Sequence, residues 1–250
     1  MLQGEPARTG DVVSILTGPG AGQWRRISQA MGPTTYLLDS PLPAGDPMVS
    51  IATGFVRQTF RKNTIDTRGS SVAANLVLVG NHYGLRVLDN HFLGGNAFVI
   101  NAAPTEKPVH WGWSHAPLMG ALIEGNVLED SVQGAKIAVE HSPKIKTSRG
   151  RVYASVMLKK NKVRWSEPFA AKHSAKGATR PAAITLGDPG TFDPTELDVT
   201  EEGNHAEGRS PIAIKVFGAR LNGKETRERV IALPASPSTT ADGARGPARR

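Results

Sequence analysis

The chain has 250 residues and a formal net charge of +8, a length that suffices for a sizeable core in one elongated domain or one domain with appendages. The absence of cysteine excludes disulfides, thiolate metal sites and a cysteine nucleophile. Only 6% of the residues are aromatic, whereas there are 27 glycines and 18 prolines, which favours many strands and turns over a helical bundle.

Residues 1–52 are predicted to form a small N-terminal β unit. Strands are expected at Val12–Leu16, Trp24–Ile27 and Thr35–Leu38, with a glycine-rich loop at Thr17–Gly22 between the first two. Three glycines in five residues permit positive φ. The loop lacks the Gly-Lys-Ser/Thr of a P-loop and the helix that follows a dinucleotide fingerprint. We therefore predict a hairpin connection and not a phosphate site.

Five later stretches share one local pattern: an apolar residue, two variable residues, Asn, one variable residue and usually another apolar residue. The stretches are FRKNTI at 60–65, VLDNHF at 87–92, IEGNVL at 123–128, LKKNKV at 158–163 and, more weakly, EEGNHA at 201–206. Their asparagines lie 27, 36, 35 and 43 residues apart. A fixed local pattern at irregular spacing predicts a wound ribbon of strands whose turns repeat while its outer loops vary in length.

In such a ribbon the apolar positions −3 and +2 stack from coil to coil and build one continuous core. The asparagines are expected at turns because Asn tolerates the left-handed backbone region, and their amides are expected to stack as a ladder. The predicted coils extend over residues 53–233. A short helix is expected within Ser166–Pro181, and the polar tail at 234–250 is expected to be disordered.

Charge is distributed unevenly along the chain. Between Lys144 and Arg180 eleven basic residues face one acidic residue, whereas Pro181–Gly208 holds seven acidic residues and no Lys or Arg. Two interpretations remain open: neighbouring coils neutralise each other, or the basic block binds a polyanion. Nucleic acid is the less favoured polyanion, because Tyr153 and Trp165 are the only aromatic residues within the block other than Phe169.

The phrases VLDNHFLGG, LIEGNVLED and VMLKKNKV resemble the asparagine-bearing turns of right-handed parallel β-helix proteins of the pectin-lyase-like group. The resemblance covers roughly residues 60–207, and GPGAGQWRRI is similar to a glycine-rich insertion in bacterial and phage β-helix proteins. The resemblance implies an all-β, right-handed parallel β-helix. It also implies contact with carbohydrate more than any one reaction, since the group includes lyases, hydrolases, epimerases, tailspikes and adhesins.

The aspartate clusters and the His-Gly and Arg-Ile-Lys motifs of the pectin hydrolases in this group are missing, although Glu124, Glu129 and Asp130 could still form a carboxylate pair. A lyase needs a cation that neutralises the uronate and a base that removes the adjacent proton. The candidate catalytic residues for that chemistry are His82, Tyr83, Arg86, Glu140 and His141. Adjacent strand residues point to opposite faces, so at most one of each neighbouring pair should face a groove.

The longest outer loop, at residues 101–117, contains two tryptophans and two histidines between prolines. These side chains could stack on sugar rings, or they could pack the loop against the coils. A His-x4-His spacing offers two metal ligands, but a third is not evident. The candidate substrate-binding residues are His110, Trp111, Trp113, His115, Lys159 and Lys160.

No cofactor and no metal ligand set is specified by the sequence, although the acidic stretch Asp188–Glu202 could bind Ca²⁺. No apolar run reaches membrane-spanning length, and the first residues lack the apolar segment of a signal peptide. Since this fold is usually exported, we expect an extracellular or cell-surface protein whose chain begins partway into a longer one, with a cytosolic protein as the alternative.

Two function classes follow. The first is a carbohydrate-active or carbohydrate-binding protein that acts on an anionic polysaccharide, with lyase chemistry ahead of hydrolysis. The second is a non-catalytic adhesin, tailspike-like module or surface structural protein. The missing acid motifs favour the second, and the His/Trp loop favours the first.

Overall fold

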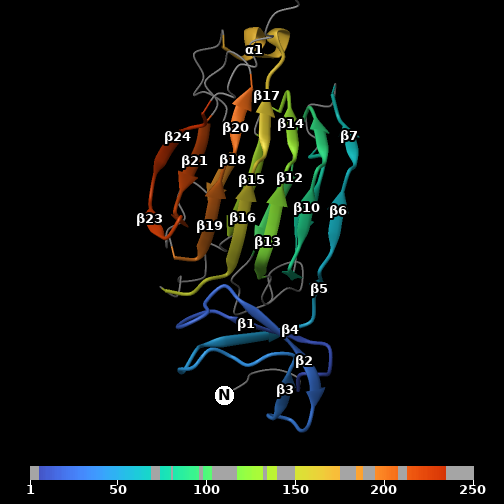
Figure 1. The fold of residues 1–250 in the computed structure, drawn as a ribbon, viewed down its shortest axis with the longest axis vertical. Helices are drawn as coiled ribbons and strands as arrows, with labels where there is room; N and C mark the ends of the chain where they lie inside the picture. Colours follow the sequence, from blue (N-terminus) through green and yellow to red (C-terminus); the bar gives the residue numbers. More distant parts are fainter. Residues whose placement is uncertain are drawn as a thin grey trace, which may run out of the picture.

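A computed structural model of the chain describes residues 6–68, 74–79, 81–95, 98–102, 117–131, 134–139, 150–174, 184–187, 195–207 and 213–234. These residues form one short helix and many short strands in four sheets (Figure 1), which confirms the predicted all-β class. Of the tail at 234–250, predicted to be disordered, residues 235–250 lie outside the described residues. Its first residue, Pro234, is described, and its carbonyl accepts from the N–H of Ala206 at 2.9 Å.

The N-terminal unit is a four-stranded antiparallel sheet in the order β3-β2-β1-β4. The three predicted strands are present, and a fourth completes the sheet: β1 (Val12–Ile15), β2 (Trp24–Ala30), β3 (Tyr36–Leu38) and β4 (Val49–Ala52). The glycine-rich loop joins β1 to β2 as a hairpin connection, as predicted.

The remaining strands form three parallel sheets, to each of which every coil contributes. The first sheet contains β6 (Thr59–Arg61), β10 (Arg86–Leu88), β13 (Leu118–Glu124), β16 (Ala154–Lys159) and β19 (Leu197–Glu202), extended by β5 (Phe55–Val56) and β9 (His82–Tyr83). The second contains β7 (Thr64–Asp66), β11 (His91–Leu93), β14 (Val127–Glu129), β17 (Lys162–Arg164) and β20 (His205–Glu207). The third contains β8 (Val77–Val79), β12 (Phe98–Ala102), β15 (Ala135–Val139), β18 (Ile184–Gly187) and β21 (Ala213–Phe217).

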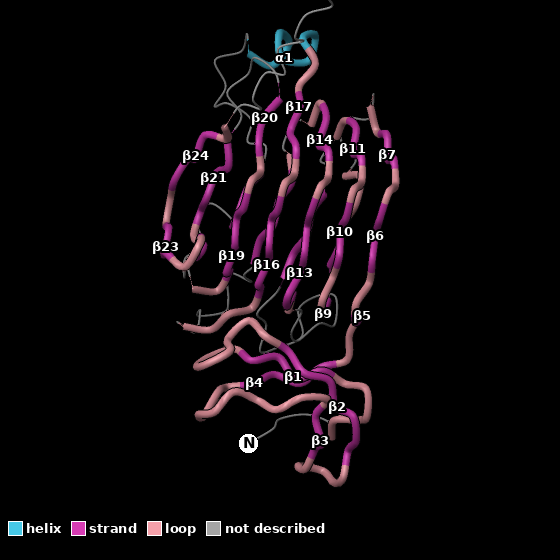
Figure 2. Tube along the Cα trace, in the orientation of Figure 1, coloured by secondary structure: helices cyan, strands magenta, loops and turns pink. Residues whose placement is uncertain are grey.

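Each strand of these five coils pairs in parallel with the equivalent strand of the next coil, which confirms the parallel β-helix. The last strands differ: β22 (Ala219–Leu221) forms an antiparallel hairpin with β23 (Lys224–Thr226), and β24 (Arg229–Ala232) runs antiparallel to β21. Figure 2 shows the strands of successive coils side by side, with the N-terminal unit against one end of the strands.

Apolar side chains stack in columns inside the coils, as the repeated pattern predicts. At position −3 the column is Phe60, Val87, Ile123 and Leu158, in register across the first sheet. At position +2 it is Ile65, Phe92, Leu128, Val163 and Ala206, in register across the second sheet. Most of these residues are fully buried and belong to one hydrophobic cluster, so one core runs the length of the coils.

The five asparagines form a continuous hydrogen-bonded ladder at the corner between the first and second sheets. The backbone N–H and the Nδ2 of Asn90 both donate to Oδ1 of Asn126, each at 3.0 Å. The Nδ2 of Asn90 also donates to the carbonyl of Phe60 in the preceding coil. The same three bonds recur at Asn126 and Asn161, so these buried amides find partners inside the protein.

One detail of the predicted turn is wrong. The left-handed backbone belongs to the residue before each asparagine: Lys62, Asp89, Gly125, Lys160 and Gly203 have φ between 51° and 68°. The asparagines themselves are not among the positive-φ residues. The reason is that the two residues have different roles. The asparagine supplies the side-chain amide of the ladder, and the preceding residue turns the backbone.

The weak fifth repeat is explained by Glu201, which occupies the −3 position where the other coils carry an apolar residue. Its Oε1 accepts from the Nδ2 of Asn204 at 2.8 Å and from the backbone N–H of Asn204 at 3.2 Å. Among the described residues Asn204 donates to no further asparagine, and a carboxylate oxygen ends the ladder.

The predicted short helix is α1 (Glu167–Ser174). The Oγ of Ser166 lies 3.4 Å from the N–H of Phe169, and Asp130 of the preceding coil accepts from both the N–H and the Oγ of Ser166. Asp130 therefore holds the start of the helix against the coils.

Candidate functional site

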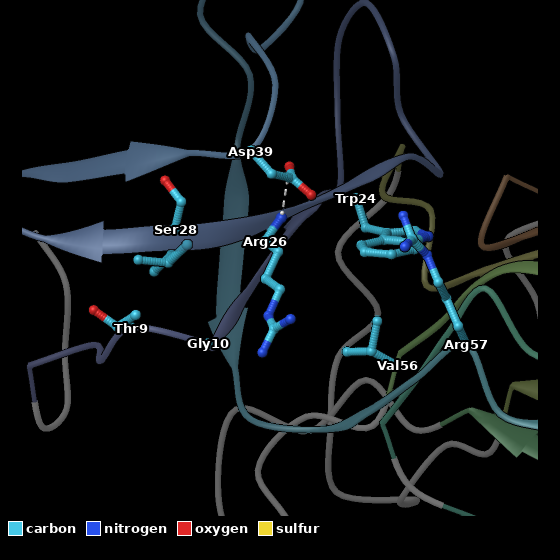
Figure 3. Close-up of a pocket in the computed structure, with 9 residues that line it drawn as sticks. Thr9, Gly10, Trp24, Arg26, Ser28, Asp39, Val56 and Arg57 are labelled. Carbon is cyan, nitrogen blue, oxygen red and sulfur yellow. Dashed lines mark hydrogen bonds between the residues drawn. The ribbon is translucent and has the colours of Figure 1, made fainter.

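A cleft of about 410 Å³ lies where the N-terminal unit meets the first coil (Figure 3). It is lined by residues of the N-terminal unit and of the first coil: Thr9, Gly10, Trp24, Arg26, Ile27, Ser28, Asp39, Val56 and Arg57. Two arginines, one indole and two hydroxyls thus share one concave surface.

The N-terminal unit is fixed against the coils by direct contacts. The Oγ of Ser155 in β16 donates to the carbonyl of Gly22 at 2.7 Å and accepts from the N–H of Gly120 at 2.8 Å. Val152 donates its N–H to the carbonyl of Leu16 at 2.8 Å. Val12 and Leu16 also belong to the core cluster of the coils. The cleft is therefore formed by two parts that share one core.

Trp24, the first residue of β2, packs on a part of the first sheet that carries no side chains. A Cβ at Gly84 would lie 3.1 Å from Cζ2 of Trp24, and a Cβ at Gly120 would lie 3.3 Å from its Nε1. Both glycines have positive φ. The indole centroid lies 6.0 Å from the ring of Tyr83. The glycines of two successive coils thus provide the space that seats the indole at the edge of the cleft.

Arg57 and Arg26 bring positive charge to the cleft. The guanidinium of Arg57 lies over the Trp24 ring, 5.9 Å from its centroid, at a distance typical of cation–π contacts. The N–H of Arg26 donates to Asp39 at 3.0 Å, which ties β2 to the end of β3 (Figure 3). Within the described part of the chain neither guanidinium has a carboxylate within ion-pair distance. Both side chains therefore keep donors for an anion.

Two of the predicted catalytic residues are buried and do not face a groove. His82 is 3% exposed; its Nδ1 lies 2.9 Å from Oε1 of Gln58 and its ring stacks on Phe55 at 5.4 Å. Tyr83 is fully buried, and burial raises the pKa of its hydroxyl to about 12. Neither residue lines the cleft described here, because both side chains are buried. The raised pKa of Tyr83 also disfavours the ionised form that a base would need.

The other predicted site residues are distributed as follows. Arg86 is exposed on the outward face of β10, next in register to Thr59 of the first coil. Lys159 lies in the fourth coil, and its Nζ pairs with Glu202 at 3.1 Å. Lys160 is exposed at the same corner with φ of 51°. Six residues lie outside the described part of the chain: His110, Trp111, Trp113, His115, Glu140 and His141.

The charged pairs between the last two coils agree with the interpretation that neighbouring coils neutralise each other. Besides Lys159 and Glu202, Lys162 pairs with Glu207 at 3.2 Å. These side chains are therefore engaged between coils, whereas the arginines of the cleft are not.

Two of the three carboxylates considered for a pair, Glu129 and Asp130, are engaged in contacts between coils. Oε2 of Glu129 accepts from Arg164 at 2.5 Å and from the ring of His91 at 2.7 Å. Burial alone would raise the pKa of Glu129, but the hydrogen bonds from Arg164 and His91 outweigh it and lower the pKa below its usual value. Asp130 is bound to Ser166. Both carboxylates hold neighbouring coils together.

Over the described ranges there is no group of three or more His, Asp or Glu side chains placed to hold a metal ion. The stretch considered for Ca²⁺ is described only from Thr195, so Asp188 and Asp193 lie outside those ranges. No helix among the described residues is long and apolar enough to cross a membrane.

Comparison with known protein-family models, with curated proteins and with solved structures gave no match. The site must therefore be interpreted from its own chemistry. The sequence pattern does not single out this site, because it predicts Trp24, Arg25 and Arg26 as a returning strand within a glycine-rich insertion and assigns them no binding role. An indole followed by two arginines, directly after a glycine-rich loop, was the available signal.

Proposed function

We propose that the protein binds an anionic polysaccharide in the cleft between its N-terminal unit and its first coil. The observation that carries the proposal is the pair of guanidiniums, Arg26 and Arg57, beside the Trp24 indole in a cleft of about 410 Å³. The hydrogen bonds and the apolar surface that these side chains offer indicate the class of ligand.

Guanidinium groups bind carboxylates and sulfates through two parallel hydrogen bonds, which is the geometry that an acidic sugar offers. The hydroxyls of Thr9 and Ser28 can exchange hydrogen bonds with sugar hydroxyls, because a hydroxyl both donates and accepts. The indole supplies an apolar surface beside them. A glycan with one acidic group per ring satisfies all three kinds of group, and such a ligand fits an extracellular or cell-surface setting.

Binding without cleavage is the function that the cleft supports best. Lyase chemistry needs a base beside the cation that neutralises the uronate. Arg26 or Arg57 could act as that cation, but the lining residues include no His, Lys or Tyr. The other arginine would then have to be the base, and a guanidinium in a protein stays protonated. Asp39, the lining carboxylate, already accepts a hydrogen bond from the backbone of Arg26. The adhesin-like alternative is therefore preferred to the lyase.

The test is affinity for polyuronates and sulfated glycans compared with neutral polymers of similar length. We expect Arg57→Asn and Arg26→Gln each to weaken binding by roughly tenfold, because each removes a charged hydrogen-bonding group. Asn at position 57 suits the left-handed backbone, where φ is 55°. Affinity should also fall as salt is added.

Arg229→Gln is the matched control, since Arg229 is exposed on β24 at the far end of the coils. Equal affinity of the wild type for charged and neutral polymers, or an equal loss in Arg229→Gln, would contradict the proposal. Release of unsaturated products from a polyuronate, abolished by Arg57→Asn, would replace binding with lyase activity at this same cleft.

A further inference from the structure

The two ends of the β-helix differ in the strands that form the edges of the sheets. At the C-terminal end β23 and β24 run antiparallel to the last parallel strands and cover their edges. At the other end β6, β7 and β8 are the last strands of their sheets. Figure 1 shows β6 and β7 along one margin of the molecule and β23 and β24 along the opposite margin. Nothing within the described residues pairs with the first coil on its outer side.

The hydrogen bonds of the first coil show which backbone groups bond to the second coil and which point away from it. Gln58 and Lys62 bond to β10, and Asn63 and Thr67 bond to β11 or its neighbours. Because strand residues alternate between the two sides, the intervening N–H and C=O groups point away from the second coil. These groups belong to Thr59, Arg61, Thr64 and Asp66. Such an edge is a template for pairing with another strand.

The side chain of Asn63 makes fewer hydrogen bonds with the described residues than the other ladder asparagines do. Its Nδ2 donates to Oδ1 of Asn90 at 2.9 Å, as in the rest of the ladder. Each later ladder asparagine also donates to the preceding coil and accepts two hydrogen bonds on Oδ1. Asn63 is exposed and makes neither of these contacts with a described residue. It therefore presents one N–H and one carbonyl oxygen together, and a primary amide of this kind is complementary to itself.

We propose that the first coil is a docking surface for a second copy of this chain, joined across a two-fold axis with its strands antiparallel. A symmetric interface requires a self-complementary surface, and the exposed amide provides one beside the axis. With the axis between Lys62 and Asn63, Arg61 lies opposite Thr64 of the second copy, and Thr59 lies opposite Asp66.

This register agrees with three independent features of the edge. The four residues whose backbone groups point away from the second coil each face another such residue of the second copy. Every facing pair can therefore exchange two backbone hydrogen bonds. Phe60 meets Ile65 of the second copy, and both are partly buried members of the core, so the core continues across the interface. Arg61 lies diagonally across from the second copy's Asp66. Within one chain these side chains already pair with Asp89 and Arg68, so the contact would join two existing ion pairs across the interface.

The two-fold arrangement closes at two copies, because the first coil of each copy is taken up by the first coil of the other. At the opposite end the first and third sheets finish with the antiparallel strands β23 and β24, which differ from the strands of the first coil.

Sedimentation of the full chain tests the proposal. The wild type is expected at twice the chain mass of 26.6 kDa. Thr64→Lys places a cation opposite Arg61 of the second copy, and we expect it to raise the dimer dissociation constant at least about tenfold through like-charge repulsion. Thr200→Lys is the matched control, because Thr200 is also exposed but lies on β19 away from this edge. The double variant Arg61→Glu with Thr64→Lys should restore part of the dimer affinity, because positions 61 and 64 of the two copies again carry opposite charges, while the new carboxylate lies near Asp89 and the second copy's Asp66.

A monomeric wild type overturns the proposal, as does a dimer that Thr64→Lys and Thr200→Lys weaken equally. Assemblies larger than two copies also overturn it. Circular dichroism of each variant separates loss of association from loss of folding: a folded, monomeric Thr64→Lys chain together with a dimeric double variant supports the two-fold interface.

Discussion

Two corners of the β-helix turn the chain from one sheet to the next in different ways. The corner between the first and second sheets takes two residues in every coil and is closed by the asparagine ladder. The corner between the second and third sheets varies in length from coil to coil. It is bordered by charged contacts such as Asp66 with Arg68 and Glu129 with Arg164. The first is buried and uniform, and the second is partly exposed and different at each level.

The difference follows from what burial requires. A buried amide must find partners for all of its polar groups, and in the ladder those partners are the equivalent atoms of the coils above and below. Each coil must therefore repeat the same residue. At the exposed corner water satisfies unpaired groups, so coils can differ there and long loops can be extruded.

The largest expected effect comes from breaking the buried corner at its centre. Asn126→Ala removes the acceptor for two N–H groups of Asn90 and the donor to both Asn161 and the carbonyl of Val87. We expect the free energy of unfolding to fall by about 4 kcal/mol in urea denaturation. Asn63→Ala, at the exposed end of the ladder, should cost about 1 kcal/mol at low protein concentration. Equal losses would show that burial does not set the difference between the corners.

A smaller effect is expected at the charged corner. The hydrogen bonds from Arg164 and His91 lower the pKa of Glu129 despite its burial, so its ionised form is favoured by folding. The resulting stability is present above the usual value of 4.5 and is lost as the pH falls through the lower folded pKa. Glu129→Gln should cost about 1 kcal/mol at neutral pH.

The wild type and Glu129→Gln should then converge in stability as the solution is acidified. Urea denaturation of both chains at a series of pH values measures this. A difference in stability that grows on acidification has the wrong sign and excludes the assigned role of the carboxylate.

The smallest effect concerns the bend of the ladder corner. Lys160 has φ of 51°, a conformation that costs a side-chain-bearing residue about 1 kcal/mol. Lys160→Gly should therefore raise thermal stability, and Gly203→Ala should lower it by about the same amount. A Cβ at Gly203 would make only ordinary contact, 3.6 Å from Cγ of Lys160. A destabilised Lys160→Gly would mean that the lysine side chain outweighs its backbone strain.

Within the coils, the parts that sequence could predict are those that repeat. The asparagine spacing and its apolar neighbours predicted the parallel coils, the stacked columns and the ladder. The pattern could not indicate which residue bends the chain, because Lys62, Asp89 and Gly125 share no common side chain. It also could not show that Glu201 replaces an apolar residue in order to end the ladder, since that depends on the absence of an equivalent asparagine beyond it.

The candidate site was less predictable because it joins segments that are distant in the chain. Trp24 meets Gly84 and Gly120 only after the N-terminal unit packs across the coils. Arg57, which follows β5 in the chain, lies over that indole. His82 and Tyr83 resembled reactive groups by residue type, but the packing of the N-terminal unit and the first coils buries them.

The ladder ends at Glu201, and this position also matters electrically. The bonds from one asparagine amide to the next all run the same way: Nδ2 donates to Oδ1 of the following coil. These aligned bonds add along the stacking axis, with their donor end at Asn204. A carboxylate stands at that end, as acidic residues do at the N-termini of α-helices. The stack therefore has a fixed polarity, although it is built from neutral side chains.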